Sequence, residues 1–340
     1  MNEAVDALVH ARVGLLGNPS DAYGGKAIAF TLGNFAAQVR IEAAAGYGIA
    51  SPDGVSASWS SFGEMAGAIS PRDRRDGERL IRAALRQFAR RFFEAHPKAA
   101  DAIPGMRIHY ETTIPREVGL SGSSAIVIAC LRALLSWFGR SLSNDEVAEL
   151  ALSAEVDELG IAAGPMDRLI QAHEGCLWMD FAAVPRGGKA VHRQLPLKRL
   201  PETFVAWDPH GGEASGVVHS DVRARYERGD EAVRSAMATF PKLVDAGMAQ
   251  LEAGDHEGFA ALVDRNFDTR ASIWNLTERD IELVAIGRRC GCAVKQTGSG
   301  GAVVGVMKHG IGFESVEREY ASAGYRVVRP TFVAPGGDES

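Results

Sequence analysis

The sequence predicts a mixed α/β protein of about two domains, and three observations support this fold class. First, a chain of 340 residues, 46% of them hydrophobic and 24% charged, is ordinary for a soluble globular protein with a large core. Second, short apolar runs typical of strands alternate with longer segments whose apolar residues recur every three or four positions, as in helices. Third, loops rich in glycine, proline and serine separate these segments.

In the first half of the chain, helix signals are clearest at two places. Apolar residues recur at helical spacing over 78–95, and Ser143 with Glu146 forms a capping box that opens a helix ending near Gly160. Pro165 suits the first turn of a short helix over 167–172. Strands are expected at 12–16, 27–42, 106–113 and 177–181, and a surface excursion at 46–77.

In the second half, a strand at 203–207 precedes a glycine-rich loop at 210–216 and two helices within 217–251. Pro241 is expected to start or kink a helix rather than to lie in its middle. Asp255 and Thr277 are predicted helix caps. The remaining elements are expected to be strands at 293–295, 303–307 and 325–329 and a helix at 314–323.

The Pro/Gly/Lys-rich run 185–189 is the predicted domain junction. It divides the chain into an N-terminal nucleotide-binding domain at 1–186 and a C-terminal domain at 187–334. A disordered tail is expected at 335–340.

Charge and composition exclude several classes of protein. The formal charge is −6 and no block of Lys and Arg stands out, which disfavours nucleic-acid binding. No apolar run reaches the roughly 20 residues that a membrane-spanning helix needs, and the first residues are not a basic segment followed by an apolar one, so a cytoplasmic protein is expected. The four cysteines form no zinc set and are expected to be reduced core thiols: Cys130, Cys176, Cys290 and Cys292.

A small-residue loop that opens a buried helix is the first candidate site. Its residues are Gly119, Leu120, Ser121, Gly122, Ser123, Ser124 and Ala125. Such a loop leaves backbone N–H groups pointing outward at the positive end of the helix dipole, and its glycines let an anion approach closely. The loop therefore predicts a phosphate site, and a capped turn with no ligand is the alternative.

The first hairpin places donors, acceptors and an aromatic ring together. These are the side chains of Arg12, Asn18, Asp21, Tyr23 and Lys26. A set of this kind holds a polyhydroxylated ligand, and the alternative is a plain polar hairpin.

Two carboxylates between the glycine-rich segments are further candidates. Glu155 falls at the edge of the buried stripe of its helix, where a half-buried carboxylate needs either a cationic partner or a metal ion. Asp167 lies in a helix first turn, where the dipole favours its ionised form by about 0.3–1 kcal/mol. Asp167 is either a base facing the site or a residue that only stabilises its helix.

The order of these features resembles the GHMP kinase superfamily of small-molecule kinases for galactose, homoserine, mevalonate and phosphomevalonate. The three glycine-rich signatures are 12–21, 115–125 and 295–301, with Glu155 and Asp167 between the second and the third. Within the superfamily the chain looks most like the glucuronokinase branch. The segments that carry this likeness are GLLGNPSD, GLSGSSAIV, GIAAGPMDR, VHSDVRARY, NFDTR and KQTGSGGAVV, and the extra residue in Gly-Leu-Ser-Gly-Ser-Ser points to the same branch.

The resemblance implies a two-domain fold, with an N-terminal domain like ribosomal S5 domain 2, a ferredoxin-like C-terminal domain and the active site in the cleft between them. It also implies roles for the candidate residues. The loop 119–125 would cradle the ATP phosphates, and Ser124 with Glu155 would hold Mg²⁺. Asp167 would be the catalytic carboxylate, with Arg12 beside it. Substrate-binding residues would be Asn18, Asp21, Lys26, Gly298, Ser299 and Gly300.

The resemblance favours an ATP-dependent sugar 1-kinase that acts on D-glucuronate. A related kinase for a neutral sugar or a mevalonate-type acid is the second reading, and a non-catalytic sensor of the same fold is the third. A protein of net charge −6 needs local cations to hold a uronate. The candidates are Lys26, Arg116, Arg223 and Arg225. A monomer or a homodimer is expected.

Overall fold

The computed structural model describes residues 4–52, 54, 56–69, 76–95, 102–161, 163–211 and 215–335. It contains two compact units. Unit 1 consists of Met1–Ala11, Phe35–Ile114 and Ser121–His173, and unit 2 consists of Arg12–Asn34, Pro115–Leu120 and Glu174–Ser340. The two units each combine discontinuous segments, and the domain boundary at 186/187 stays a prediction. The predicted tail lies outside the described residues except for Pro335.

Two long strands contribute residues to both units. They are β1 (Ala4–Leu16) and β2 (Lys26–Ala43), which pair with each other. The predicted strand at 12–16 is the end of β1, which begins eight residues earlier.

In unit 1 the second half of β2 pairs antiparallel with β5 (Met106–Thr112). Next to β5 lies β3 (Tyr47–Ala50), parallel to it, and β4 (Ser56–Trp59) follows at the edge. The predicted surface excursion at 46–77 is therefore wrong in part, because two short strands and α1 (Phe62–Met65) lie there. These strands are short and rich in glycine and serine, so their pattern is too weak to be recognised from sequence.

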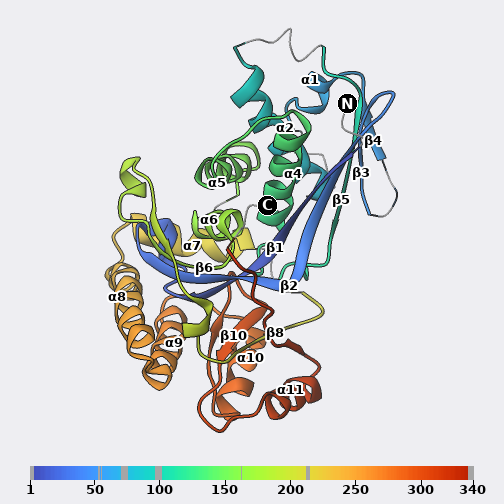
Figure 1. The fold of residues 1–340 in the computed structure, drawn as a ribbon. Helices are drawn as coiled ribbons and strands as arrows, with labels where there is room; N and C mark the ends of the chain where they lie inside the picture. The colour runs from blue at the N-terminus through green and yellow to red at the C-terminus, as the bar shows by residue number, and fades with distance from the viewer. Residues whose placement is uncertain are drawn as a thin grey trace. The chain divides into compact units, whose positions relative to one another are not determined.

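The helices of unit 1 are α2 (Asp76–Phe93), α4 (Gly122–Trp137), α5 (Asn144–Ser153), the π-helix η2 (Ala154–Glu158) and α6 (Met166–His173). Figure 1 shows α2 and α4 side by side. The predicted capping box is present, since Ser143 accepts a hydrogen bond from the backbone N–H of Glu146 and the Glu146 side chain returns to Ser143. Apolar residues on most sides of α4 are buried, as its sequence predicts.

In unit 2 the first half of β2 pairs antiparallel with β6 (Cys176–Asp180), which pairs with β7 (Val191–Gln194). A separate four-stranded sheet has the order β11-β8-β10-β9, with β8 (Thr203–Trp207), β9 (Ala293–Gln296), β10 (Ala302–Val306) and β11 (Arg326–Val328). Short 3-10 turns are η1 (Ser20–Tyr23), η3 (Val184–Arg186) and η4 (Leu197–Arg199). The strands that the sequence predicts in this half are thus confirmed within a residue or two.

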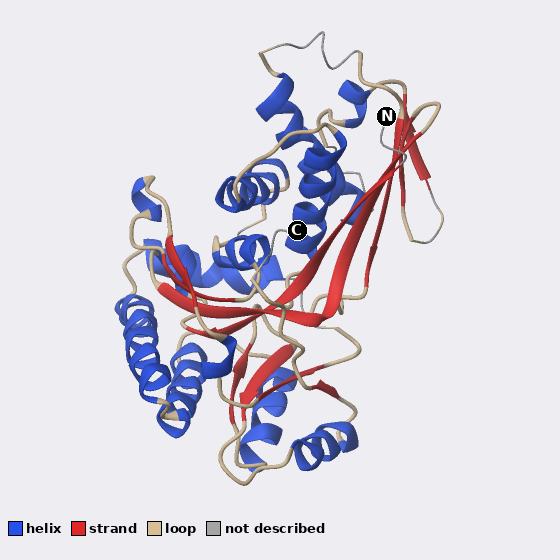
Figure 2. Cartoon of the chain, viewed as in Figure 1, coloured by secondary structure: helices blue, strands red, loops and turns tan. Residues whose placement is uncertain are grey.

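The helices of unit 2 are α7 (Ser215–Glu227), α8 (Glu231–Ala253), α9 (His256–Ala271), α10 (Glu278–Arg289) and α11 (Phe313–Ser322). In Figure 2 the long helices α8 and α9 lie beside each other. Asp255 caps α9 and Thr277 caps α10, as predicted. The expectation for Pro241 is wrong, because this proline lies inside α8. Residue 241 lacks the N–H that would bond to residue 237, and the long helix continues through this position because buried side chains on both sides of Pro241 pack it into unit 2.

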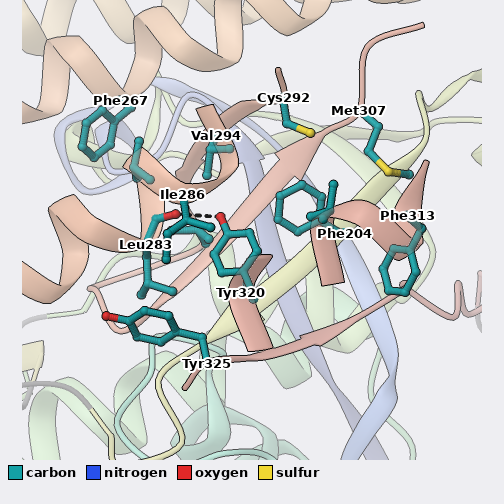
Figure 3. Close-up of a cluster of buried hydrophobic side chains, with 14 residues drawn as sticks. Phe204, Phe267, Leu283, Ile286, Cys292, Val294, Met307, Phe313, Tyr320 and Tyr325 are labelled. Carbon is teal, nitrogen blue, oxygen red and sulfur yellow. Dashed lines mark hydrogen bonds between the residues drawn. The ribbon is translucent and has the colours of Figure 1, made fainter. Parts of the chain in front are cut away.

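A compact apolar core lies between the four-stranded sheet and helices α10 and α11. Figure 3 shows its side chains, among them Phe204 on β8, Leu283 on α10 and Tyr320 on α11. The Tyr320 hydroxyl donates a 2.6 Å hydrogen bond to the carbonyl of Leu283. This bond gives the hydroxyl of a fully buried tyrosine a hydrogen-bond partner, so its burial leaves no unsatisfied donor in the core.

All four cysteines are free thiols, as predicted. Burial raises the pKa of Cys130 and of Cys176, which keeps both as inert thiols. Within the described part of the chain, no helix combines the length and the apolar character needed to cross a bilayer.

Candidate active site

Three glycine-rich segments meet in unit 2, and Thr297 joins them. Its carbonyl accepts hydrogen bonds from the backbone N–H of Gly14, at 3.0 Å, and from Asn18 Nδ2, at 3.3 Å. Its hydroxyl donates to the carbonyl of Gly119 at 3.0 Å. One residue of the third signature thus contacts the first signature and the part of the second that belongs to unit 2.

Glycine is required where the second and third signatures touch. A Cβ on Gly298 would lie 2.3 Å from the carbonyl oxygen of Gly119. A Cβ on Gly119 would lie 2.9 Å from the backbone nitrogen of Ser299, and Gly119 also has a positive φ of 71°. The two loops therefore pack backbone against backbone, which no residue with a side chain allows.

Two buried arginines hold carbonyl groups of these loops. Arg12 Nη1 donates to Gly119 O at 2.6 Å. Arg270 donates to two successive carbonyls, from Nη1 to Gly298 O at 2.7 Å and from Nη2 to Ser299 O at 2.9 Å. Because the C=O and N–H groups of a trans peptide point in opposite directions, the following N–H groups point away from the guanidinium groups. N–H groups oriented in this way are suited to bind an anion.

Burial lowers the pKa of Arg270 to about 10, and the charge of Asp280 opposes this shift. Asp280 also accepts a 2.8 Å hydrogen bond from the backbone N–H of Gly301. A cation and a carboxylate thus fix the two ends of the third glycine-rich loop. Neither role was predicted from the sequence, although Arg270 is the last residue of the segment NFDTR.

Lys295 is a third buried cation in unit 2. Its Nζ donates to Gly14 O at 2.7 Å, to Asn18 Oδ1 at 2.6 Å and to Gln296 O at 2.6 Å. Burial, reinforced by the charges of Arg270 and Arg12, holds the pKa of Lys295 well below its usual value. This lysine joins the first hairpin to β9, a role that was not predicted from the sequence.

The Asn18 side chain forms hydrogen bonds within unit 2. Its Oδ1 accepts from Lys295, its Nδ2 donates to Thr297, and its own carbonyl accepts from Asn266 Nδ2 at 3.2 Å. Asn18 is 2% exposed, so its side chain fixes the hairpin from inside. Its predicted contact with a sugar hydroxyl stays a prediction.

Lys26 and Asp21 differ in their surroundings. Lys26 Nζ lies 2.7 Å from Asp245 Oδ1 and 3.7 Å from Asp180 Oδ2, and the hydrogen bond to Asp245 raises the pKa of this lysine. Asp21 is buried in η1. Near it, the rings of Tyr23 and Tyr226 lie 4.6 Å apart.

The other cations proposed for a uronate are also partly engaged. Arg225 Nε donates to Asp230 Oδ2 at 2.9 Å, and Nη1 donates to Ile273 O at 2.8 Å. Arg223 Nε lies 3.6 Å from Glu227 Oε1 one helical turn away, and both side chains are exposed. Within the set, Lys26 and Arg225 are the more firmly paired.

In unit 1 the start of α4 is joined to α6. Ser121, a left-handed residue with φ 60°, is the N-cap of α4, and its hydroxyl donates to Asp167 Oδ2. Ser124 Oγ donates to Gln171 Oε1 at 2.8 Å, and Gln171 Nε2 donates to Ser121 O at 3.1 Å. The first helical bond of α4 comes from Ala125, so the N–H groups of 122–124 precede the helical ladder and lie at the positive end of the dipole.

Glu155 lies in the π-helix η2 and is completely buried, not half-buried as the sequence predicts. The Nε of Arg168 donates to Glu155 Oε2 at 2.5 Å, and Nη2 contacts the same oxygen. Of the two alternatives for this carboxylate, the structure thus contains the ion pair. Glu155 Oε1 has no hydrogen-bond partner within the described residues, which leaves the metal assignment a prediction.

Asp167 contacts Ser121 and Arg168. It lies in the first turn of α6, as predicted, with its side chain 20% exposed. Oδ2 accepts from Ser121 and lies 3.8 Å from Arg168 Nη1. Arg168 Nη1 also donates to Gly164 O at 2.9 Å, just before the helix. An oriented, partly exposed carboxylate of this kind can accept a proton from a ligand hydroxyl.

The chain was compared with known proteins. Residues 79–175 match the family model described as the GHMP kinases N terminal domain. Glucuronokinase 1 of Arabidopsis thaliana is 35% identical over 98% of this chain and 94% of its own length. Probable glucuronokinase 2 of the same plant is 35% identical over 96% of this chain and 90% of its own length.

Solved structures share the fold. The mevalonate kinase of Methanococcus jannaschii has a TM-score of 0.77 and 17% sequence identity, and the match covers 98% of this chain and 99% of that one.

Proposed function

The chain belongs to the GHMP kinase family, and we propose that it is an ATP-dependent kinase that phosphorylates the anomeric hydroxyl of D-glucuronate. The observation that carries the substrate is the likeness to two glucuronokinases along nearly the whole chain. The site geometry is compatible with the reaction type, because phosphoryl transfer needs an acceptor near the hydroxyl and several cationic or N–H donors around the phosphates.

In this proposal Asp167 accepts the proton of the attacking hydroxyl. Its hydrogen bond from Ser121 and its contact with Arg168 orient the carboxylate. The N–H groups at the start of α4, with those of Gly119 and Leu120, bind the ATP phosphates. Gly298, Ser299 and Gly300 present further N–H groups, and Arg270 orients those of Ser299 and Gly300 by binding the preceding carbonyls.

We propose Mg²⁺ as the metal ion, with Ser124 and Glu155 as its protein ligands. The donors fit this ion, since Glu155 Oε1 is buried without a hydrogen-bond partner in the described chain. Ser124 Oγ donates its proton to Gln171 and so keeps lone pairs for a metal. When bound, Mg²⁺ would neutralise charge on the transferred phosphate.

For the sugar we propose Asn18, Asp21 and Lys26 on the first hairpin, with Arg12 beside the reacting group. Arg12 and Asn18 are anchored by the loops they contact, so their positions are defined. Among the cations named for the uronate carboxylate, we propose Arg223 as the best candidate, because its ion pair with Glu227 is long and exposed. A cytoplasmic location, where thiols stay reduced, completes the proposal.

The test is a coupled ADP-release assay with ATP and a panel of acceptors: D-glucuronate, D-galacturonate, D-glucose, D-galactose and mevalonate. We expect the highest kcat/KM for D-glucuronate, with the product identified as the 1-phosphate by ³¹P NMR. One charged hydrogen bond contributes about 1.5–3 kcal/mol, so we expect glucuronate to be preferred over glucose by roughly 10- to 150-fold. A preference for a neutral sugar or for mevalonate would exclude the uronate assignment, and a preference for galacturonate would change only the substrate.

A further inference from the structure

Arg168 makes an unusual set of contacts within unit 1. The residue is 4% exposed and directly follows the proposed catalytic carboxylate, Asp167. Its guanidinium group reaches three oxygens on two segments. Nε and Nη2 contact Glu155 Oε2, while Nη1 donates to Gly164 O at 2.9 Å and lies 3.8 Å from Asp167 Oδ2.

These contacts connect the guanidinium group to a rigid support. Glu155 lies in a π-helix, where the backbone carries one extra residue per turn, and its carboxylate is completely enclosed. A buried carboxylate paired with a buried arginine holds that arginine in one orientation, because moving either charge away leaves the other unpaired. Arg168 is therefore fixed through Nε and Nη2, and a different nitrogen, Nη1, lies near Asp167.

Two contacts of Asp167 meet at the same carboxylate oxygen. Ser121 Oγ and Arg168 Nη1 both approach Oδ2. A carboxylate held at one oxygen by a hydroxyl from the α4 N-terminus and by a fixed cation has a defined direction. The bond from Arg168 to Gly164 O also fixes the turn that precedes α6, and hence the backbone from which Asp167 projects.

We propose that Arg168 is a positioning residue that orients Asp167 for catalysis, with Glu155 as its anchor. This inference rests on the proposed function of Asp167. It adds a role for Glu155 Oε2 that is separate from any role of Oε1 toward a metal. Arg168→Gln should lower stability in either case, because Glu155 loses its buried counter-charge, whereas only the positioning role also lowers kcat of the folded enzyme.

The test compares Arg168→Lys and Arg168→Gln with the wild type in the full chain, at saturating Mg²⁺ and with Glu155 intact. Arg168→Gln removes the charge, and a misplaced catalytic group costs on the order of 100-fold, so we expect kcat to fall roughly 10- to 100-fold with KM for ATP within about threefold. Arg168→Lys retains a cation but cannot reach Glu155 and Gly164 together, so its kcat should lie between the two.

A matched control is Arg132→Gln. Arg132 on α4 also donates to a backbone carbonyl of α6, to Ala172 O at 2.8 Å, at the opposite end of that helix from Asp167. We expect this variant to lower Tm and to keep kcat. Circular dichroism melts of all variants give the stability readout.

Three outcomes overturn the inference: Arg168→Gln keeps kcat within twofold of the wild type, the Lys and Gln variants have equal kcat, or Arg132→Gln loses as much kcat as Arg168→Gln. If Arg168→Gln does not fold, Arg168→Lys is used instead. A folded Arg168→Lys variant with wild-type kcat would also overturn the inference. If the proposed substrate is wrong, the wild type will prefer another acceptor in the panel. The same variants are then compared with that acceptor, so the two proposals are tested separately.

Discussion

Lys295 Nζ and Asn18 Oδ1 are joined by a 2.6 Å hydrogen bond in the interior of unit 2. The bond connects the strand before the third glycine-rich loop to the turn of the first hairpin. The lysine is 1% exposed, and Nζ also donates to two backbone carbonyls, so dipoles surround the amino group. Burial lowers the pKa of Lys295, so the stability of the protein depends on pH through this residue.

Lys295→Met should change how stability varies with pH. The folded-state pKa of Lys295 lies well below its ordinary value of 10.5, so between these two values the unfolded chain binds one more proton than the folded chain. The free energy of unfolding of the wild type therefore rises with pH across this window. Burial of Lys295 destabilises the fold least at the alkaline end of the window. The difference in free energy of unfolding between wild type and Lys295→Met should increase in favour of the wild type from pH 7 to pH 10.

Urea unfolding at four pH values in that range measures this difference. The three acceptors left by the substitution should make the variant less stable by about 1–3 kcal/mol at the alkaline end. A difference that is constant, or that shrinks as pH rises, would contradict the lowered pKa of Lys295.

Arg270→Lys should weaken ligand binding while preserving the charge. A lysine cannot donate to Gly298 O and Ser299 O in the fork geometry that Arg270 uses, so the loop loses one fixed carbonyl and its N–H groups lose their orientation. We expect kcat/KM to fall roughly 10- to 100-fold, since one charged hydrogen bond is worth about 1.5–3 kcal/mol.

Arg288→Lys is the matched control for Arg270→Lys. Arg288 on α10 pairs with Asp264 and Asp268, which lie on α9, and its side chain is 34% exposed. It should leave kcat/KM unchanged. Equal losses in the two variants would mean that the loop geometry does not depend on Arg270.

Asp167→Asn retains the size of the side chain and its hydrogen bond with Ser121 but removes the base. We expect kcat to fall roughly 10²- to 10⁴-fold with little change in Tm. Asp145→Asn is the control, because Asp145 also lies in a helix first turn and pairs with His173. If both variants lose only stability, Asp167 stabilises its helix and does nothing more.

Glu155→Gln should raise the Mg²⁺ concentration needed for half-maximal rate and lower kcat, because it weakens the proposed metal ligand. It should also lower Tm, since Arg168 loses its buried counter-charge. The rate is measured against Mg²⁺ from 0.1 to 50 mM. Arg168→Gln breaks the same ion pair with the carboxylate intact, so an unchanged Mg²⁺ dependence there and a shifted one here would assign the metal role to Glu155 itself. An unshifted Mg²⁺ dependence in Glu155→Gln would remove this residue from the metal site.

Local signals in the sequence were sufficient for most elements. Helix caps at Ser143, Asp255 and Thr277 depend on residues three positions apart, and the predicted caps are present. The glycine-rich segments were recognised because loops that pack backbone against backbone need glycine, and a run of glycines is visible in the sequence. The two weak strands at 47–50 and 56–59 and the proline inside α8 were missed, because neighbouring elements rather than local preference stabilise them.

The sequence by itself determined the elements, the three signatures, the family resemblance and the candidate carboxylates, since each depends on residues close together in the chain. Only the tertiary structure decided which partner each charged side chain has. Arg168 was found to face Glu155, and Arg270 and Lys295 were found behind the glycine-rich loops, 28 residues from Gly298 in the case of Arg270 and 277 residues from Asn18 in the case of Lys295. The enclosure of Glu155 is likewise a tertiary property. Burial and the pairing of buried charges depend on which distant segments pack together, and spacing along the chain carries no direct record of that packing.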